Sequence, residues 1–213
     1  MERPLRLLLR TPPATEPLTL SDVKSYMGVT SSTDDTMITS LIVAVREFCE
    51  DHLKRSLITQ EWSMFLDKWP SSESDEWWDG VREGAHIRNY VDFISLPKNP
   101  VVTVDAVKIY ATDDTSTTWA SSNYAVDIYS MKARLALSAS GTPPVPTRKV
   151  NGIEVRYTAG YGASGSDVPN SILEGMKMMI FHMYENKGCS CSGGASASGA
   201  KNIWSKFVVT EGM

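Results

Sequence analysis

The sequence has few of the residues from which catalytic and metal-binding sites are usually built. Its 213 residues include three cysteines and three histidines. An odd number of cysteines, without the spacing of a disulfide framework, argues against a cross-linked scaffold. Cys189 and Cys191 lie close together, but a zinc site needs about four suitably spaced ligands. We therefore expect no metal and no other cofactor.

Long apolar runs and an excess of positive charge are also missing. No apolar run reaches the ~18–20 residues of a membrane span, and Leu7–Leu9 is too short for the apolar part of a signal peptide. The formal net charge is -4, which argues against attraction of the whole chain to nucleic acid. The hydrophobic fraction of 42% is enough for a core. We expect a soluble, intracellular protein of one domain that makes no contact with a membrane.

Motifs of catalytic sites are missing as well. A hydrolytic triad needs a nucleophile and an acid around a histidine, and no nucleophile elbow accompanies His52, His86 or His182. Residues 157–162, YTAGYG, are similar to a potassium-channel filter in letters, but that reading needs flanking membrane helices. The glycines instead predict a tight turn with positive φ. We therefore expect that the protein is not an enzyme.

Two N-terminal helices are predicted from capping residues and apolar spacing. The first covers 19–27, with Thr19 as N-cap, Asp22 as its capping-box partner and Gly28 as the stop. The second covers 33–55 and follows a cluster of capping and acidic residues. Its apolar side chains recur at steps of three and four and form one broad face. They are Ile38, Leu41, Ile42, Val45, Phe48, Cys49 and Leu53.

A third helix is predicted over 169–187, because Pro169 suits a first helical position and a glycine follows the end. Methionine is frequent on its apolar face, which favours core packing and also permits an interface. This face comprises Ile172, Met176, Met179, Ile180, Met183 and Tyr184. Gly175, inside the helix, costs ~1 kcal/mol relative to alanine. We interpret it as a point where another backbone approaches closely.

The chain between the second and third helices changes to a period of two. Alternating and β-branched segments, separated by turn residues, predict an antiparallel β-rich section over 57–158. The order helix, helix, strands, helix predicts an α+β fold, a small helical core with this section inserted. Residues 19–187 would form the main domain. Residues 1–18, with Arg3, Arg6 and Arg10, would be an extended arm, and 188–213 a flexible linker and tail.

Several segments occur in a defined order over roughly residues 18–187. They read LTLSDVKSYMGV, TDDTMITSLIVAVREFCE, RSLITQEWSMFLDKWP, ISLPKNPVVTVDAVKIY, NYAVDIY, IEVRYTAGYG and VPNSILEGMKMMIFHMYENKG. Their joint order and spacing resemble the head–tail connector (adaptor) proteins of long-tailed bacteriophages and their prophage relatives. Two stretches depart from that pattern. The acidic, tryptophan-bearing segment 70–92 is longer, and residues 188–200 are unusually rich in glycine, serine and alanine.

The resemblance implies a structural virion protein of the neck, made in the host bacterial cytoplasm. It implies a homo-oligomeric ring, expected to contain twelve copies, that docks on the portal protein. Such a ring extends the DNA channel, lets DNA pass without sequence-specific binding, and offers a surface to the next neck or tail protein. The alternatives are another neck or tail component, such as a stopper or tail terminator, and a small hydrolase. Stoppers and terminators are usually more purely β, and a hydrolase would need a motif that the sequence lacks.

The C-terminal residues Trp204, Phe207, Val208 and Val209 form a small apolar cluster beyond the linker. An apolar anchor on a flexible tether is typical of a segment that orders on binding, which predicts docking on the portal. In that case deletion of 201–213 leaves the fold intact and weakens docking. The alternative is a tail that folds back on its own domain.

Two further sets of residues are candidates for the ring. The acids Glu73, Asp75, Glu76 and Asp79 suggest a solvated loop, a paired-carboxylate site, or an acidic surface of the DNA channel that repels phosphate. The helices 33–55 and 169–187 are expected to supply the contacts between subunits. The candidates for these contacts are Arg46, Glu50, Met179 and Met183.

Overall fold

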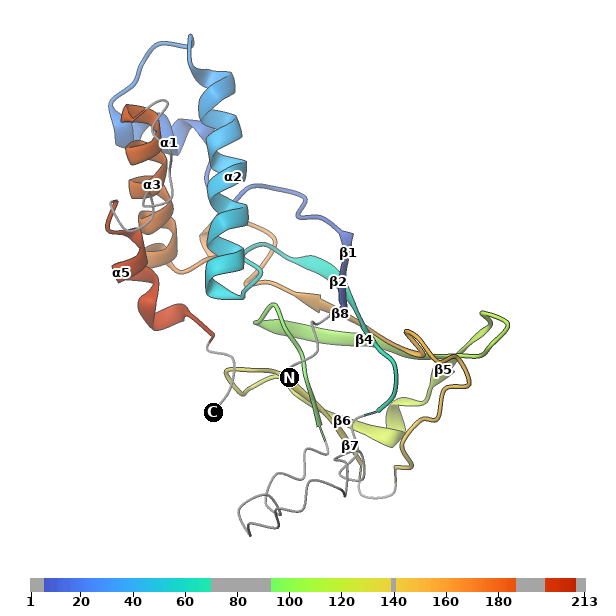
Figure 1. Ribbon diagram of the computed structural model, residues 1–213. Helices are drawn as coiled ribbons and strands as arrows, with labels where there is room; N and C mark the ends of the chain where they lie inside the picture. The colour runs from blue at the N-terminus through green and yellow to red at the C-terminus, as the bar shows by residue number, and fades with distance from the viewer. Residues whose placement is uncertain (1–5, 70–92, 139–140, 187–197, 210–213) are drawn as a thin grey trace, which may run out of the picture. The chain divides into compact units, whose positions relative to one another are not determined.

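The computed structural model describes residues 6–69, 93–138, 141–186 and 198–209 (Figure 1). The chain divides into two units that each combine segments far apart in the sequence. Unit 1 comprises Met1–Thr11, Glu61–Pro97 and Val101–Thr158. Unit 2 comprises Pro12–Gln60, Lys98–Pro100 and Ala159–Met213. Unit 1 contains the sheets and unit 2 the helices, which confirms the predicted α+β fold.

Unit 2 is built on the predicted helices. They are α1 (Leu20–Met27), α2 (Asp35–Leu53) and α3 (Asn170–Glu185), with a short α5 (Ala200–Trp204) and 3-10 turns η4 (Gly165–Asp167) and η6 (Ser205–Phe207). The capping box of Thr19 and Asp22 is present, and Gly28 ends α1 in the left-handed conformation. Asp34 precedes α2 but makes no side-chain cap hydrogen bond.

The core of unit 2 lies between α2 and α3, with α1 and α5 packed against it. The buried face of α2 is the predicted one, except that Leu41 is only partly buried and Phe48 is 39% exposed. The members of this core include Val23, Ile38, Ile42, Val45, Cys49, Leu53, Ile172, Met176, Met179, Ile180 and Trp204. Full burial of a side chain of this size stabilises a fold by roughly 1.5–3 kcal/mol.

Unit 1 holds a five-stranded and a three-stranded sheet. The larger has the order β1-β2-β8-β4-β5 and the smaller β3-β7-β6. The strands are β1 (Arg6–Thr11), β2 (Gln60–Leu66), β3 (Phe93–Ser95), β4 (Val101–Tyr110), β5 (Ser116–Trp119), β6 (Tyr124–Asp127), β7 (Arg134–Leu137) and β8 (Ile153–Ala159), with a 3-10 turn η3 (Ser121–Asn123). Ile153, Val155 and Tyr157 of β8 are all buried, as their alternation predicts.

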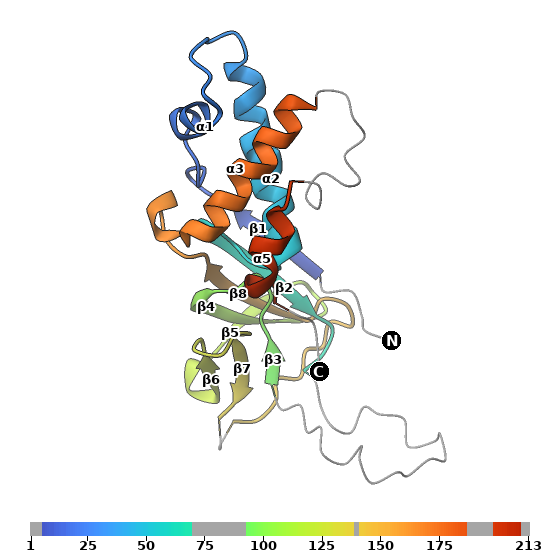
Figure 2. The same ribbon diagram turned by 90° about the vertical axis from the view of Figure 1, so that its left-hand side faces the viewer.

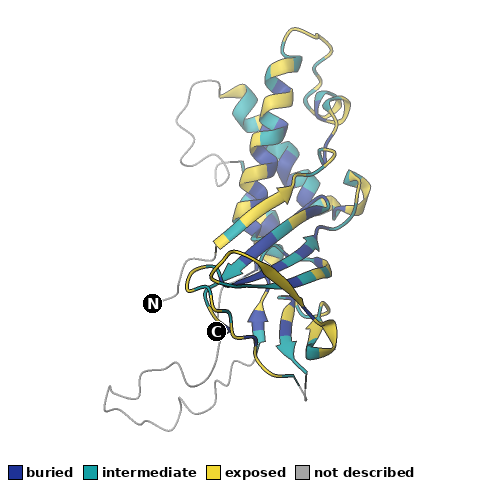
Figure 3. Cartoon of the chain, turned by 90° about the vertical axis from the view of Figure 1, so that its right-hand side faces the viewer, coloured by how far each residue is buried: buried dark blue, intermediate teal, exposed yellow. Residues whose placement is uncertain are grey.

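Strand β1 lies at an edge of the larger sheet. Residues 6–11, placed by the sequence in a terminal arm, are extended but pair with β2 in antiparallel register, Leu8 opposite Ser63. The register shifts between Leu9 and Thr11, which marks a bulge. This strand is mostly exposed and is the yellow arrow in Figure 3. The N-terminal segment is therefore part of the sheet and not a free arm over these residues.

The turn after β8 has the backbone that its glycines predicted. Gly160 has φ 142, and a Cβ atom there would lie 2.6 Å from the carbonyl of Ile58. The N–H of Tyr161 donates to the carbonyl of Leu57 over 3.1 Å. A side chain at 160 would separate these two stretches, so glycine is required for their close approach.

Candidate assembly interface

The C-terminal segment lies in the core of unit 2. Trp204 is fully buried, and its indole N–H donates to the carbonyl of Ile172 over 3.1 Å. The N–H of Val209 donates to the carbonyl of Leu53 over 3.1 Å, while Phe207 and Val208 are half-buried. The second alternative for the tail, that it folds back on its own domain, therefore describes residues 200–209. A docking role for Trp204 and Val209 would require both to leave the core.

Gly175 explains how α3 accommodates this segment. A Cβ atom at this position would overlap the indole ring of Trp204. The close approach predicted at Gly175 is real, but the approaching group is a side chain and not a backbone. The sequence could not pair the two residues, because the stretch between them carries no periodic signal.

Arg46 and Glu50 form a buried ion pair inside unit 2. Arg46 donates to Glu16 over 2.8 Å and to Glu50 over 2.9 Å, and the two residues of the pair are 8% and 6% exposed. Glu50 also accepts from the N–H of Leu57 and the amide of Gln60. Burial lowers the pKa of Arg46, but attraction to the two carboxylates outweighs it and raises the pKa overall.

The four candidate ring contacts all take part in packing within the subunit. Arg46 and Glu50 form an ion pair with each other inside the subunit. Met179 is 5% exposed and Met183 packs against the same core, so the methionine face turns into the subunit. A contact of these four side chains with a neighbouring subunit stays a prediction.

Three aromatic side chains of unit 2 are exposed, which the apolar spacing of its helices did not predict. Tyr26 of α1 and Phe181 of α3 are 42% and 41% exposed, and their rings meet edge to face at 6.4 Å. Phe48 of α2 stacks on His52 at 6.2 Å. The signal in the sequence was the spacing of Phe181, which lies two residues, about 200°, from the buried Met179.

A buried carboxylate organises the larger sheet of unit 1. Glu154 of β8 is fully buried and accepts hydrogen bonds from Ser63, Tyr110, Arg156 and Arg10 of its own and three other strands. Burial raises the pKa of this carboxyl group, but the four hydrogen bonds outweigh burial and hold the pKa at about 2. The arrangement links four strands of the sheet through one carboxylate.

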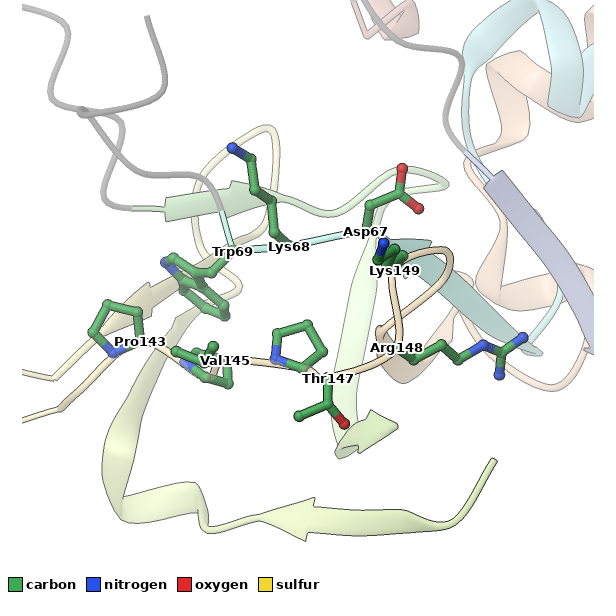
Figure 4. A pocket seen from close by; sticks show the side chains of 10 residues that line it. Asp67, Lys68, Trp69, Pro143, Val145, Thr147, Arg148 and Lys149 are labelled. Atoms are coloured by element: carbon green, nitrogen blue, oxygen red, sulfur yellow. The ribbon is translucent and has the colours of Figure 1, made fainter. Parts of the chain in front are cut away.

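A cavity of about 550 Å³ lies in unit 1 between the end of β2 and the loop 143–149 (Figure 4). Prolines, Val145 and Trp69 form its apolar part, and Lys68 and Lys149 are exposed at the rim. No histidine or cysteine is among its ten lining residues. Its polar lining consists of Asp67, Thr147, Arg148 and the two lysines.

Some sequence candidates fall outside the described residues. Glu73, Asp75, Glu76 and Asp79 do so, and so do Cys189 and Cys191. Within the described ranges, no group of three or more histidine, cysteine, aspartate or glutamate side chains is placed to hold a metal ion. The same parts of the chain contain no helix that is long and apolar enough to cross a membrane.

Comparison with known proteins agrees with this picture of a structural protein. The family of phage gp6-like head-tail connector proteins matches residues 17–132, more than half of the chain. The chain belongs to this family, which consists of structural proteins and not of enzymes. None of the curated proteins matches the chain.

Solved structures with a similar fold come from gene transfer agent (GTA) particles. A chain from the neck of an empty GTA particle, computed with C6 symmetry, has a TM-score of 0.74 at 19% identity, over 98% of this chain and 97% of that one. A chain from the virion of a native GTA particle has a TM-score of 0.72 at 18% identity, over 97% of each chain. A third, from the neck of a native GTA particle computed with C12 symmetry, has a TM-score of 0.65 at 18% identity, over 98% and 97%. At this identity the likeness concerns the fold.

Proposed function

We propose that the protein is a connector subunit in the neck of a phage-like particle, where its copies form a ring beneath the portal. The observation that carries this proposal is family membership together with a fold shared over nearly the whole chain with proteins from particle necks. A neck structure computed with C12 symmetry supports twelve copies as the expected number. In this role the protein acts through shape and interfaces rather than through chemistry.

The proposed ring has different partners at its two ends. One face meets the portal protein, and the other receives the next neck or tail protein. The portal would bind the C-terminal segment through the half-buried side chains of Phe207 and Val208. The buried Trp204 and Val209 would hold that segment in place.

DNA would pass through the ring without sequence-specific binding. The acids Glu73, Asp75, Glu76 and Asp79 would face the channel and repel phosphate. A variant with all four acids changed to their amides should slow or arrest passage of DNA. Unchanged retention and ejection of DNA by particles carrying it would refute this role of the acids.

The experiment that tests the proposed function is electron microscopy of the purified full chain, alone and mixed with the portal protein of the same particle. We expect a ring coaxial with the portal, on its tail-facing side. A protein that forms no ring in either sample, or a ring that binds elsewhere on the particle, would overturn the proposal.

A further inference from the structure

We draw no further inference here: the strongest candidate, the tip of the hairpin that joins β6 to β7 (Figure 2), where the side chains of Tyr129 and Met131 are 95% and 66% exposed, is an apolar surface patch of unit 1, and nothing in the structure shows what covers it.

Discussion

The indole of Trp204 occupies the space left by Gly175, and its N–H donates to the carbonyl of Ile172 one turn earlier on α3. Trp204 and Ile172, which lie 32 positions apart in the sequence, are thereby joined in one contact. The contact turns the C-terminal segment from a presumed tether into a part of the core of unit 2. It also makes the missing side chain at 175 a requirement of the fold.

Replacement of Trp204 by alanine is expected to lower the free energy of unfolding by about 3–5 kcal/mol, because it empties a fully buried site. Deletion of 201–213 should destabilise unit 2 by at least as much. Urea denaturation followed by circular dichroism measures both. Lys206→Ala, at an exposed position of the same segment, is the control and should change little. An unchanged transition in Trp204→Ala would refute the core assignment.

Gly175→Ala should destabilise the protein, although alanine is favoured over glycine in a helix by about 1 kcal/mol. The added Cβ atom overlaps the indole, so the loss should shrink when Trp204 is changed to leucine in the same chain. A double-mutant cycle measured by thermal unfolding gives this coupling. Additive effects of the two changes would mean that the residues do not touch.

Arg46→Met is expected to cost about 3–5 kcal/mol, because it leaves the carboxylates of Glu16 and Glu50 without their buried cation. Lys54→Met, which removes an exposed pair with Asp51, should cost no more than about 1 kcal/mol. Chemical denaturation near neutral pH compares the two. Equal small effects would show that the Arg46 pair is not buried in solution.

Glu154 should make the stability of unit 1 sensitive to acid. Its pKa of about 2 in the folded chain lies below the ordinary value of 4.5. Its contribution, roughly 3 kcal/mol, is therefore complete above pH 4.5 and is lost as the pH falls toward 2. The stability advantage of the wild type over Glu154→Gln should shrink over that window in urea denaturation at a series of pH values. The control Glu61→Gln, at an exposed position of β2, should lose stability toward acid as the wild type does. A difference in the free energy of unfolding between the wild type and Glu154→Gln that stays constant with pH would contradict the assignment.

Gly160 and Gly28 offer a matched pair of glycines with positive φ. Nothing lies within 4 Å of a Cβ atom at Gly28, so Gly28→Ala should cost only the left-handed penalty of about 1–2 kcal/mol. Gly160→Ala should cost clearly more, because its Cβ atom would also meet the backbone of Ile58. Thermal unfolding of both variants shows which one lowers the melting temperature more. Equal decreases would show that the backbone at Ile58 moves aside at little cost.

Features set by local chemistry could be predicted from the sequence. The capping box at Thr19, the stop at Gly28 and the buried faces of α2 and α3 depend on residues within one or two turns of each other. Pro169, expected at the first helical position, stands immediately before the first residue of α3.

Features that depend on partners far away in the sequence could not be predicted from it. Strand β1 reads as an arm because its partner β2 lies more than fifty residues away. The sequence predicts Trp204 to be a free anchor, because the buried position that its indole occupies is formed by residues of α3. Phe48 fits the apolar period of α2, and only packing shows that it lies at the edge of the buried face.

The interleaving of the two units has a consequence for synthesis of the chain. Unit 2 needs Trp204 from near the C-terminus to fill its core, and unit 1 needs β8 at the centre of its sheet. Neither unit can therefore be completed before β8 and, for unit 2, Trp204 have been synthesised. Until then the helical core lacks its largest side chain and its apolar faces stay exposed. The order of synthesis thus makes the core of unit 2 one of the last parts of residues 1–209 to close.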